Sequence, residues 1–371
     1  MPRRSLLIAA CLLAIPLAAA PTADAARKAP NGFFGTIFDG PIKSAAPTLV
    51  DGEFGRMTAA GVQSVRTNFH WGDIQPARGT TTFAKTDVLV RAAAEHGQIV
   101  LPVVTSAPRW ARKYPAKEGS PPKRVAEYTA LLDALVGRYG PSGSFWTENP
   151  TVPKRPIRAW QIWNEPNLPY QWARAGNQGF KKVAPAYGKL LKASRKTLRK
   201  ADRGSKVVLA ALTNFSWKVL ATLYKSGHIR GAFDVAAVNA YSNRAADFIT
   251  IADAVRDVLR RNGGGKVPIW FTEFTAPAAK GRVKVPVYQR RFITTDAQMA
   301  KVVKASYTAF ATKGRRLGVQ RAYWYTWAST YQKGHPLGFF EYAGLRRFTG
   351  GAPTDRPAVR AYRQVARKYG G

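Results

Sequence analysis

The stretch WQIWNEPN at residues 160–167 predicts a buried strand that ends abruptly in polar residues. The apolar run over residues 157–163 has the composition and alternation of a strand. Pro166 cannot continue a sheet and biases the residue before it away from a helix. The strand is therefore expected to stop here and to place Asn164 and Glu165 at its carboxyl end. They could belong to a functional site or to an ordinary polar turn.

Strand-like and helical segments alternate along the rest of the chain in the same way. Strands are expected at 33–38, 62–68, 99–104, 157–163, 206–211, 233–239, 267–273 and 319–325. Helices are expected at 47–60, 83–96, 121–139, 180–200, 217–226, 246–261, 296–312 and 357–369. Apolar strands separated by helices indicate a parallel sheet covered on its outer face. The pattern predicts an α/β fold, a single (β/α)8 TIM barrel. A doubly wound sheet is the alternative, but no glycine-rich phosphate turn follows the first strand.

The first 25 residues are expected to be a secretory signal peptide, followed by one catalytic domain over residues 26–371. Arg3 and Arg4 precede an apolar run, and residues 23–25 read Ala-Asp-Ala, an A-x-A cleavage pattern. A twin-arginine signal and a lipobox at Cys11 are alternatives. The expected mature protein is secreted, monomeric and without a membrane span.

Cysteine and histidine usage argues against metal or disulfide chemistry. Cys11 is the only cysteine and lies within the expected signal, and the four histidines are scattered. Neither an H-E-x-x-H nor a C-x-x-C spacing is present. The sequence therefore predicts no metal site and no cofactor.

The chain of 371 residues is strongly basic, with a formal net charge of +37. Removal of residues 1–25 takes away two arginines and one aspartate and leaves +36. Such a charge favours polyanionic partners, including anionic cell-wall or extracellular glycans. The charge could equally be a general feature of the source organism's proteins or serve solubility, because the basic residues are spread over the whole chain. No nucleic-acid motif accompanies the charge, so no nucleic-acid partner is expected.

Two glutamates stand at the carboxyl ends of facing strands, where barrel enzymes carry their function. Glu165 ends the fourth expected strand and Glu273 the seventh, with Arg66 on the second. Cleavage of a glycosidic bond needs a proton for the leaving oxygen and an electron-rich group beneath the anomeric carbon. Two carboxylates in unlike environments supply both. Taken alone, Glu273 could be a loop-end residue paired with a lysine.

At these residues the chain resembles glycoside hydrolase clan A, the retaining (β/α)8 glycosidases, and most closely family 39 and its cellulase-like relatives. The Asn-Glu-Pro sequence at residues 164–166 is similar to the clan's acid/base motif. The resemblance covers most of residues 33–330. Further segments that resemble the clan are residues 65–76, 106–111, 269–274 and 323–325.

The resemblance implies roles for individual residues. Glu165 would be the general acid and then the general base, and Glu273 the nucleophile. Arg66 would keep Glu273 ionised, because a nearby cation favours the charged form. Tyr241 would bond to Glu273, Asn164 would bond the sugar 2-hydroxyl, and Trp324 would form the floor of the cleaved sugar's subsite. Substrate contacts are expected from Asn164, Arg66, Tyr241, Trp324, Trp327, Asn239, Trp71 and Trp110.

Two departures from the clan pattern weaken any transfer of sugar specificity. Asn239 stands where many relatives have a histidine, and Ala328 where many have an aspartate. Trp71 and Trp110 could be sugar platforms or ordinary packing residues.

The expected function is that of a secreted retaining glycosidase that cleaves β-O-glycosidic bonds of a polysaccharide or oligosaccharide. Its two carboxyl groups would lie about 5 Å apart. The alternative is a non-catalytic protein that binds polyanions or cell-wall glycans on a barrel scaffold. The sequence leaves the sugar and the choice of endo or exo attack open.

Overall fold

The computed structural model of the protein describes residues 28–213, 215–330 and 338–370. The expected signal peptide at residues 1–25, with Cys11, lies outside the described residues. Within the described helices, none combines the length and the apolar character that a membrane span requires.

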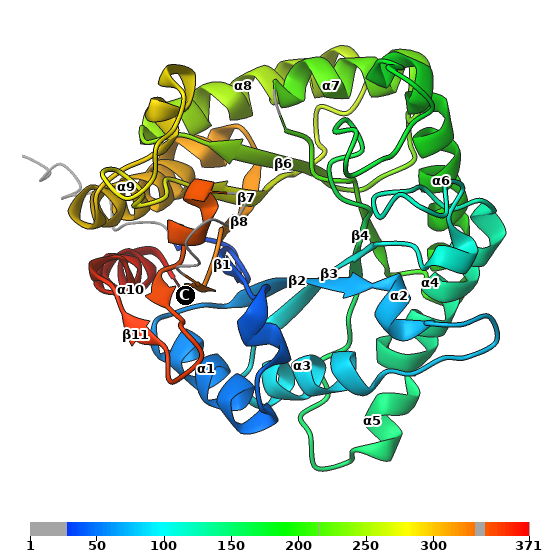
Figure 1. The fold of residues 1–371 in the computed structure, drawn as a ribbon, viewed down its shortest axis with the longest axis horizontal. Helices are drawn as coiled ribbons and strands as arrows, with labels where there is room; N and C mark the ends of the chain where they lie inside the picture. Colours follow the sequence, from blue (N-terminus) through cyan, green and yellow to red (C-terminus); the bar gives the residue numbers. More distant parts are fainter. Residues whose placement is uncertain (1–27, 214, 331–337, 371) are drawn as a thin grey trace, which may run out of the picture.

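The strands of the described chain form a parallel barrel, which confirms the predicted (β/α)8 TIM barrel (Figure 1). The eight-stranded sheet in this part of the chain has the order β5-β4-β3-β2-β1-β8-β7-β6. Isolated parallel bridges from Val208 to Val235 and from Leu212 to Val238 join its outermost strands, β5 and β6. The strands are β1 (Phe34–Ile37), β2 (Ser64–His70), β3 (Ile99–Thr105), β4 (Ala159–Ile162), β5 (Lys206–Val208), β6 (Ala236–Tyr241), β7 (Ile269–Thr275) and β8 (Val319–Trp324).

Helices surround the strands in a ring, as Figure 1 shows. They are α1 (Pro47–Ala59), α2 (Trp71–Ile74), α3 (Ala84–Glu95), α4 (Val125–Tyr139), α5 (Ser144–Glu148), α6 (Phe180–Ala201), α7 (Ser216–Thr222), α8 (Ala245–Arg261), α9 (Asp296–Ala309) and α10 (Pro357–Tyr369). All eight expected helices are present. The short helices α2 and α5 are additional, as is a small sheet of β9 (Ala328–Ser329), β10 (Arg346–Arg347) and β11 (Thr354–Asp355).

Local hydrogen bonding sets two helix starts. A capping box begins α9, where the side chain of Thr295 accepts from the backbone of Gln298 and the side chain of Gln298 accepts in return. The start expected for α4 at Pro121 is wrong, because residues 121–123 bond back to the loop before them. The N–H of Lys113 donates to the carbonyl of Pro121, and α4 begins only at Val125.

Apolar side chains form two distinct clusters, one inside the barrel and one between the sheet and the helices. The inner cluster includes Leu101, Val208, Trp270 and Tyr323, whereas a much larger cluster packs between the strands and the helix ring. Because successive side chains of a strand point to opposite faces, the inner cluster identifies which residues of each strand point inward. On β8, Tyr323 points inward and its neighbour Trp324 packs outward.

Candidate active site

The end of β4 turns sharply at the stretch that organises the sequence. Trp163 has φ 70° and Glu165 has φ 40°, both in the left-handed region that side chains other than glycine rarely adopt. The N–H of Glu165 bonds to the carbonyl of Ala211 beyond β5, which fixes the turn against its neighbour. The backbone of Glu165 thus adopts the left-handed conformation, whereas the following proline alone would favour an extended one. The turn holds Asn164 and Glu165 at the mouth of the barrel.

Arg66 on β2 ties three strands together through one guanidinium. Its Nε donates to Oε1 of Gln161 at 2.8 Å, and its two terminal nitrogens donate to Asn164 at 2.9 Å and to Glu273 at 2.7 Å. Arg66 is buried, so this ion pair is shielded from water. The planar fork of arginine suits such a fixed multi-point contact. The predicted contact between Arg66 and Glu273 is present.

Glu273 on β7 accepts a hydrogen bond at each carboxylate oxygen. Arg66 donates to Oε1, and the hydroxyl of Tyr241 donates to Oε2 at 2.8 Å. Burial, followed by the charge of Glu273, raises the pKa of Tyr241 well above its ordinary value, so this hydroxyl keeps its proton. Acceptance at both oxygens is the pattern of an ionised carboxylate.

Glu165 has a different environment although it is equally buried. It is 6% exposed and Glu273 is 8% exposed. Oε1 of Glu165 accepts one hydrogen bond, from the side-chain amide of Asn239 at 2.8 Å. Burial and the nearby charge of Glu273 raise the pKa of Glu165 to about 8, against weaker lowering effects of Asn239 and Arg66. At neutral pH this carboxyl group is mainly protonated and can donate a proton.

Asn239 positions Glu165 through a side-chain hydrogen bond. It is buried, and its Oδ1 accepts from the hydroxyl of Thr272 at 3.0 Å, which orients its amide toward Glu165. An irregularity in the pairing of β6 and β7 between Val238 and Asn239 brings Asn239 opposite Glu273. Such bulges redirect side chains next to functional sites. The structure thus gives Asn239 a positioning role toward Glu165, and the substrate contact expected for it stays a prediction.

The expected tryptophan platforms are packing residues in this structure. Trp71, Trp324 and Trp327 are at most 1% exposed, so none offers a ring face to a sugar. The indole of Trp71 donates to Gln75, and that of Trp324 donates to the carbonyl of Ala343.

Trp110 is half-buried and also fails to present a free platform. Arg78 lies over its ring at 4.8 Å, and its indole N–H donates to the carbonyl of Gln75. Its edge-to-face partner is the buried Trp71, with ring centroids 5.6 Å apart. These contacts account for both tryptophans as packing residues.

Two tyrosines, Tyr325 and Tyr170, lie within range of the charges of Glu165 and Glu273. Tyr325 follows Trp324 and points into the barrel, where burial and the charge of Glu273 raise its pKa. Tyr170, beyond β4, is 66% exposed as a residue, but partial burial of its hydroxyl and then the charges of Glu165 and Glu273 raise its pKa. The alternation of β8 could have identified Tyr325. No local signal marks Tyr170, which lies in a loop.

A second polar cluster lies on the β1–β3 side of the mouth. Lys43 forms an ion pair with Asp39 at 3.9 Å and also donates to the carbonyl of Asn68, while the Asn68 amide donates to Asp39. Nδ1 of His70 lies 2.9 Å from the hydroxyl of Ser106. Burial lowers the pKa of both Lys43 and His70. The charge of Asp39 also acts on Tyr325, so this cluster borders the carboxylate site.

No group of three histidine, cysteine, aspartate or glutamate side chains lies close enough to hold a metal ion in the described part of the chain. Around the two glutamates, the described polar groups are the carboxyl pair itself, Arg66, side-chain amides and tyrosine hydroxyls. This set can donate a proton, offer a nucleophilic carboxylate and form hydrogen bonds.

Comparisons with known proteins find likenesses in structure only. No family model and no curated protein matches the sequence. A family 39 glycoside hydrolase from Bacteroides cellulosilyticus WH2 superposes with TM-score 0.62 and 17% identity, over 93% of this chain and 65% of that chain. A family 51 alpha-L-arabinofuranosidase from Bifidobacterium longum gives 0.61 and 13%, over 92% and 73%. The endo-beta-1,4-mannanase from Thermotoga petrophila gives 0.57 and 13%, over 93% and 77%.

These matches confirm the resemblance to clan A glycoside hydrolases at the level of the fold. The chain spans slightly less than two thirds of the length of the family 39 protein. Identities of 13–17% carry no conclusion about activity or substrate.

Proposed function

We propose that the protein is a retaining glycoside hydrolase that cleaves β-O-glycosidic bonds by double displacement. The observation that carries the proposal is the pair of buried glutamates in unlike environments, a protonated Glu165 and an ion-paired Glu273. A difference in protonation between two neighbouring carboxyl groups supports Glu165 as the acid and Glu273 as the nucleophile. The fold likeness to glycoside hydrolases supports the same reaction class.

The first displacement forms a covalent intermediate. A carboxylate oxygen of Glu273 attacks the anomeric carbon, the bond to the leaving oxygen breaks, and Glu165 gives its proton to that oxygen. Arg66 and Tyr241 hold Glu273 in place through hydrogen bonds of 2.7 and 2.8 Å. Arg66 also orients Asn164, which would bond the sugar 2-hydroxyl.

The second displacement returns both carboxyl groups to their starting states. Glu165 takes a proton from water as the water oxygen attacks the anomeric carbon, and Glu273 leaves as a carboxylate. The negative charge of Glu273 contributes to the raised pKa of Glu165. Formation of the ester removes that charge, so the pKa of Glu165 falls and the same group can act as a base.

The protein is also proposed to act outside the cell. The support is the N-terminal pattern of two arginines, an apolar run and an A-x-A site within residues 1–25. N-terminal sequencing of the protein exported by its native host would test this point.

A mechanism-based probe tests the catalytic proposal directly. We expect 2-deoxy-2-fluoro glycosides with an activated leaving group to label the peptide that carries Glu273, as detected by mass spectrometry. NMR of the first product released from a panel of plant, fungal and bacterial glycans should show retention at the anomeric carbon. The variant Glu273→Gln is the matched control and should not be labelled. Binding of glycans without turnover or labelling would instead favour the non-catalytic alternative, and inversion would refute double displacement.

A further inference from the structure

The loop between β7 and α9, residues 276–295, forms a cationic pocket that the proposed reaction does not use. A cavity of about 690 Å³ lies between this loop and Asn243, which follows β6. Its polar lining consists of the side chains of Lys280, Lys284, Arg290, Asn243 and Gln298. No aspartate or glutamate is among the residues that line it. The pocket therefore offers positive charge and amide groups to a ligand.

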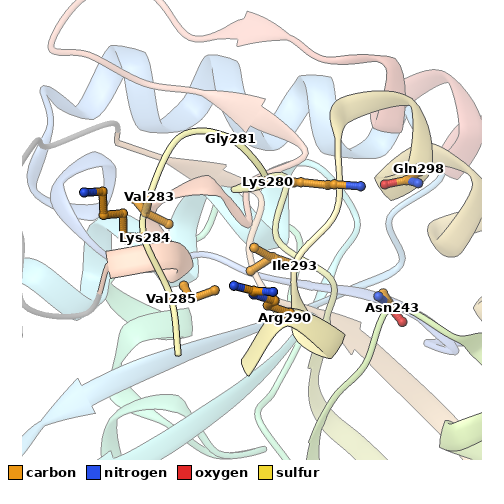
Figure 2. Close-up of a pocket in the computed structure, with 9 residues that line it drawn as sticks. All are labelled: Asn243, Lys280, Gly281, Val283, Lys284, Val285, Arg290, Ile293 and Gln298. Atoms are coloured by element: carbon orange, nitrogen blue, oxygen red, sulfur yellow. The ribbon is translucent and has the colours of Figure 1, made fainter. Parts of the chain in front are cut away.

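Figure 2 shows how these side chains lie. Lys280 and Gln298 extend toward one another, and Arg290 and Asn243 lie below them in the same view. Lys284 stands at the other end of the loop with its amine directed away from Lys280. Lys280 and Arg290 both line the body of the cavity, so their charges add to its positive potential.

Neither cation is neutralised by the described protein. Lys280 and Arg290 are exposed and form no ion pair with any residue in the described ranges, whereas Arg282 of the same loop pairs with Asp296 at 2.6 Å. Gln298 uses its Oε1 in the capping box of α9, which leaves its amide N–H groups as donors. Unpaired cations beside free amide donors suit an oxyanion, since charge-assisted hydrogen bonds are the stronger ones.

A second cavity, of about 240 Å³, shares a chain segment of its wall with the cationic pocket. That cavity is lined by Asn239 and Tyr241, which contact the two catalytic glutamates, and by Arg291 and Phe292. Residues 290 and 293 line the first cavity, and 291 and 292 the second. Consecutive Cα atoms lie about 3.8 Å apart, so one short segment forms a wall of both cavities.

Aromatic rings accompany this path on the surface. Trp217 and Phe215 line the second cavity, and Phe215 is 59% exposed. Tyr288, on the loop that forms the cationic pocket, is 67% exposed. Aromatic faces at these positions could stack on sugar rings. A glycan chain that leaves the carboxylate site along this route would meet ring faces first and cations next.

We propose that the cationic pocket binds an oxyanion carried by the glycan, so that the substrate is an acidic polysaccharide. The inference rests on the proposed glycosidase function, because it identifies the substrate class of that site. Lys280 and Arg290 bind the oxyanion, Asn243 and Gln298 complete its hydrogen bonds, and the carboxylate site acts on a neighbouring unit. Carboxylate, sulfate ester and phosphodiester share this chemistry.

Binding measurements test the pocket independently of turnover. In a Glu165→Gln background, which stops proton donation, dissociation constants are measured for polygalacturonate, chondroitin sulfate, a glycerol-phosphate teichoic acid and carboxyl-reduced polygalacturonate. We expect at least one acidic polymer to bind more tightly than the carboxyl-reduced glycan. Lys280→Gln/Arg290→Gln should weaken that binding about tenfold, since each exposed ion pair contributes up to about a factor of five. Lys284→Gln should weaken it less.

The matched control is Lys192→Gln/Lys196→Gln on α6, which removes the same charge from exposed positions on another side of the ring. This control should bind the acidic polymers as the parent does. Equal losses in both double variants, or equal affinity of the parent for all four polymers, would overturn the proposal. The polymer that responds identifies the oxyanion.

A failure of the catalytic proposal is recognised separately. It would show as wild-type protein that neither hydrolyses any glycan of the panel above nor is labelled by the 2-deoxy-2-fluoro glycosides, while the binding differences persist. A failure of the pocket proposal would show as unchanged binding of acidic polymers by the Lys280→Gln/Arg290→Gln variant, whether or not the wild type digests a glycan.

Discussion

Two buried arginine–glutamate pairs in this barrel have the same chemistry and different surroundings. Arg66 and Glu273 meet at 2.7 Å at the barrel mouth, and Arg346 and Glu53 meet at 2.5 Å between β10 and α1. The side chain of Glu273 is 11% exposed, whereas that of Glu53 is 2% exposed.

The neighbours of each pair decide what the pair can do. Glu273 has a second carboxyl group close by, Glu165, whose pKa it helps to raise. Glu53 instead accepts the indole N–H of the fully buried Trp327 at 2.8 Å. The first pair is placed for chemistry, and the second joins α1 to the C-terminal segment. A buried ion pair therefore indicates function only when a reactive partner and access to a ligand accompany it.

The largest expected effect comes from removal of the charge of Glu273. Glu273→Gln should lower kcat by about 10⁴-fold or more, because the nucleophile is lost, while the protein stays folded. Turnover of the substrate identified by the glycan panel, together with thermal unfolding, would check both parts. Near-normal activity of this variant would refute the nucleophile assignment.

The same substitution in the other pair should affect stability and not chemistry. Glu53→Gln removes the buried partner of Arg346 and leaves it only the exposed Asp355, 2.8 Å from its Nε, so we expect a loss of about 3 kcal/mol in the free energy of unfolding. Denaturant titration measures it, and kcat of the folded fraction should not change. The control Asp257→Asn breaks the exposed pair with Arg260 and should cost less than about 1 kcal/mol. Equal losses in the two variants would contradict the distinction.

A smaller contrast comes from removal of one hydrogen bond to each carboxylate. Tyr241→Phe removes the donor to Glu273 and should lower kcat about 10- to 100-fold, since a hydrogen bond to a charged group contributes about 1.5–3 kcal/mol. Trp327→Phe removes the donor to Glu53 and should lower stability by a similar free energy with little change in kcat. Parallel kinetics and unfolding curves of the two variants make the comparison. If Trp327→Phe lost activity without losing stability, the residue would instead act in substrate binding, as the sequence predicted.

The most gradual effect is the pH dependence set by Glu165. Its pKa of about 8 predicts that kcat/KM falls about tenfold per pH unit above that value, as the proton donor is lost. Because the pKa in the folded protein lies above the unfolded value, the stability that the protonated group contributes is complete below pH 4.5 and is lost as the pH rises through about 8. Glu165→Gln should therefore gain stability relative to the wild type at alkaline pH. With activated leaving groups this variant should show no alkaline decline, and a persistent decline would assign the titration to another group.

The parts of the site that the sequence predicts correctly are those encoded within single strands. The apolar run before Asn164 and Glu165, closed by Pro166, marks a strand end from residues 157–167 alone. The repeat of strands and helices then fixes the barrel, and the barrel places Glu273 opposite Glu165. The polar Gln161 within an apolar strand also indicated a buried polar contact. The alternation of side chains along β4 directs it to the same face as Arg66, which donates to it.

The tryptophans show where such reasoning ends. Trp324 and Tyr325 are adjacent, and a shift of one residue in the inward alternation exchanges which of them faces the site. Composition favours tryptophan as a platform, but the packing of β8 buries it and leaves Tyr325 inside the barrel. Asn239 likewise acquires its contact with Glu165 only through the irregular register between β6 and β7.

The sequence by itself determined the barrel and the placement of Glu165, Glu273 and Arg66 at strand positions that meet at its mouth, because strand periodicity and strand ends are local properties of the chain. Only the tertiary structure decided which carboxyl group is protonated, because the raised pKa of Glu165 results from burial and from the charge of Glu273 on another strand. It also decided the pairing of Glu53 with Arg346, 293 residues away, and the meeting of Lys280 and Arg290 in one pocket. Burial and charge proximity depend on how distant segments pack, which no local pattern encodes.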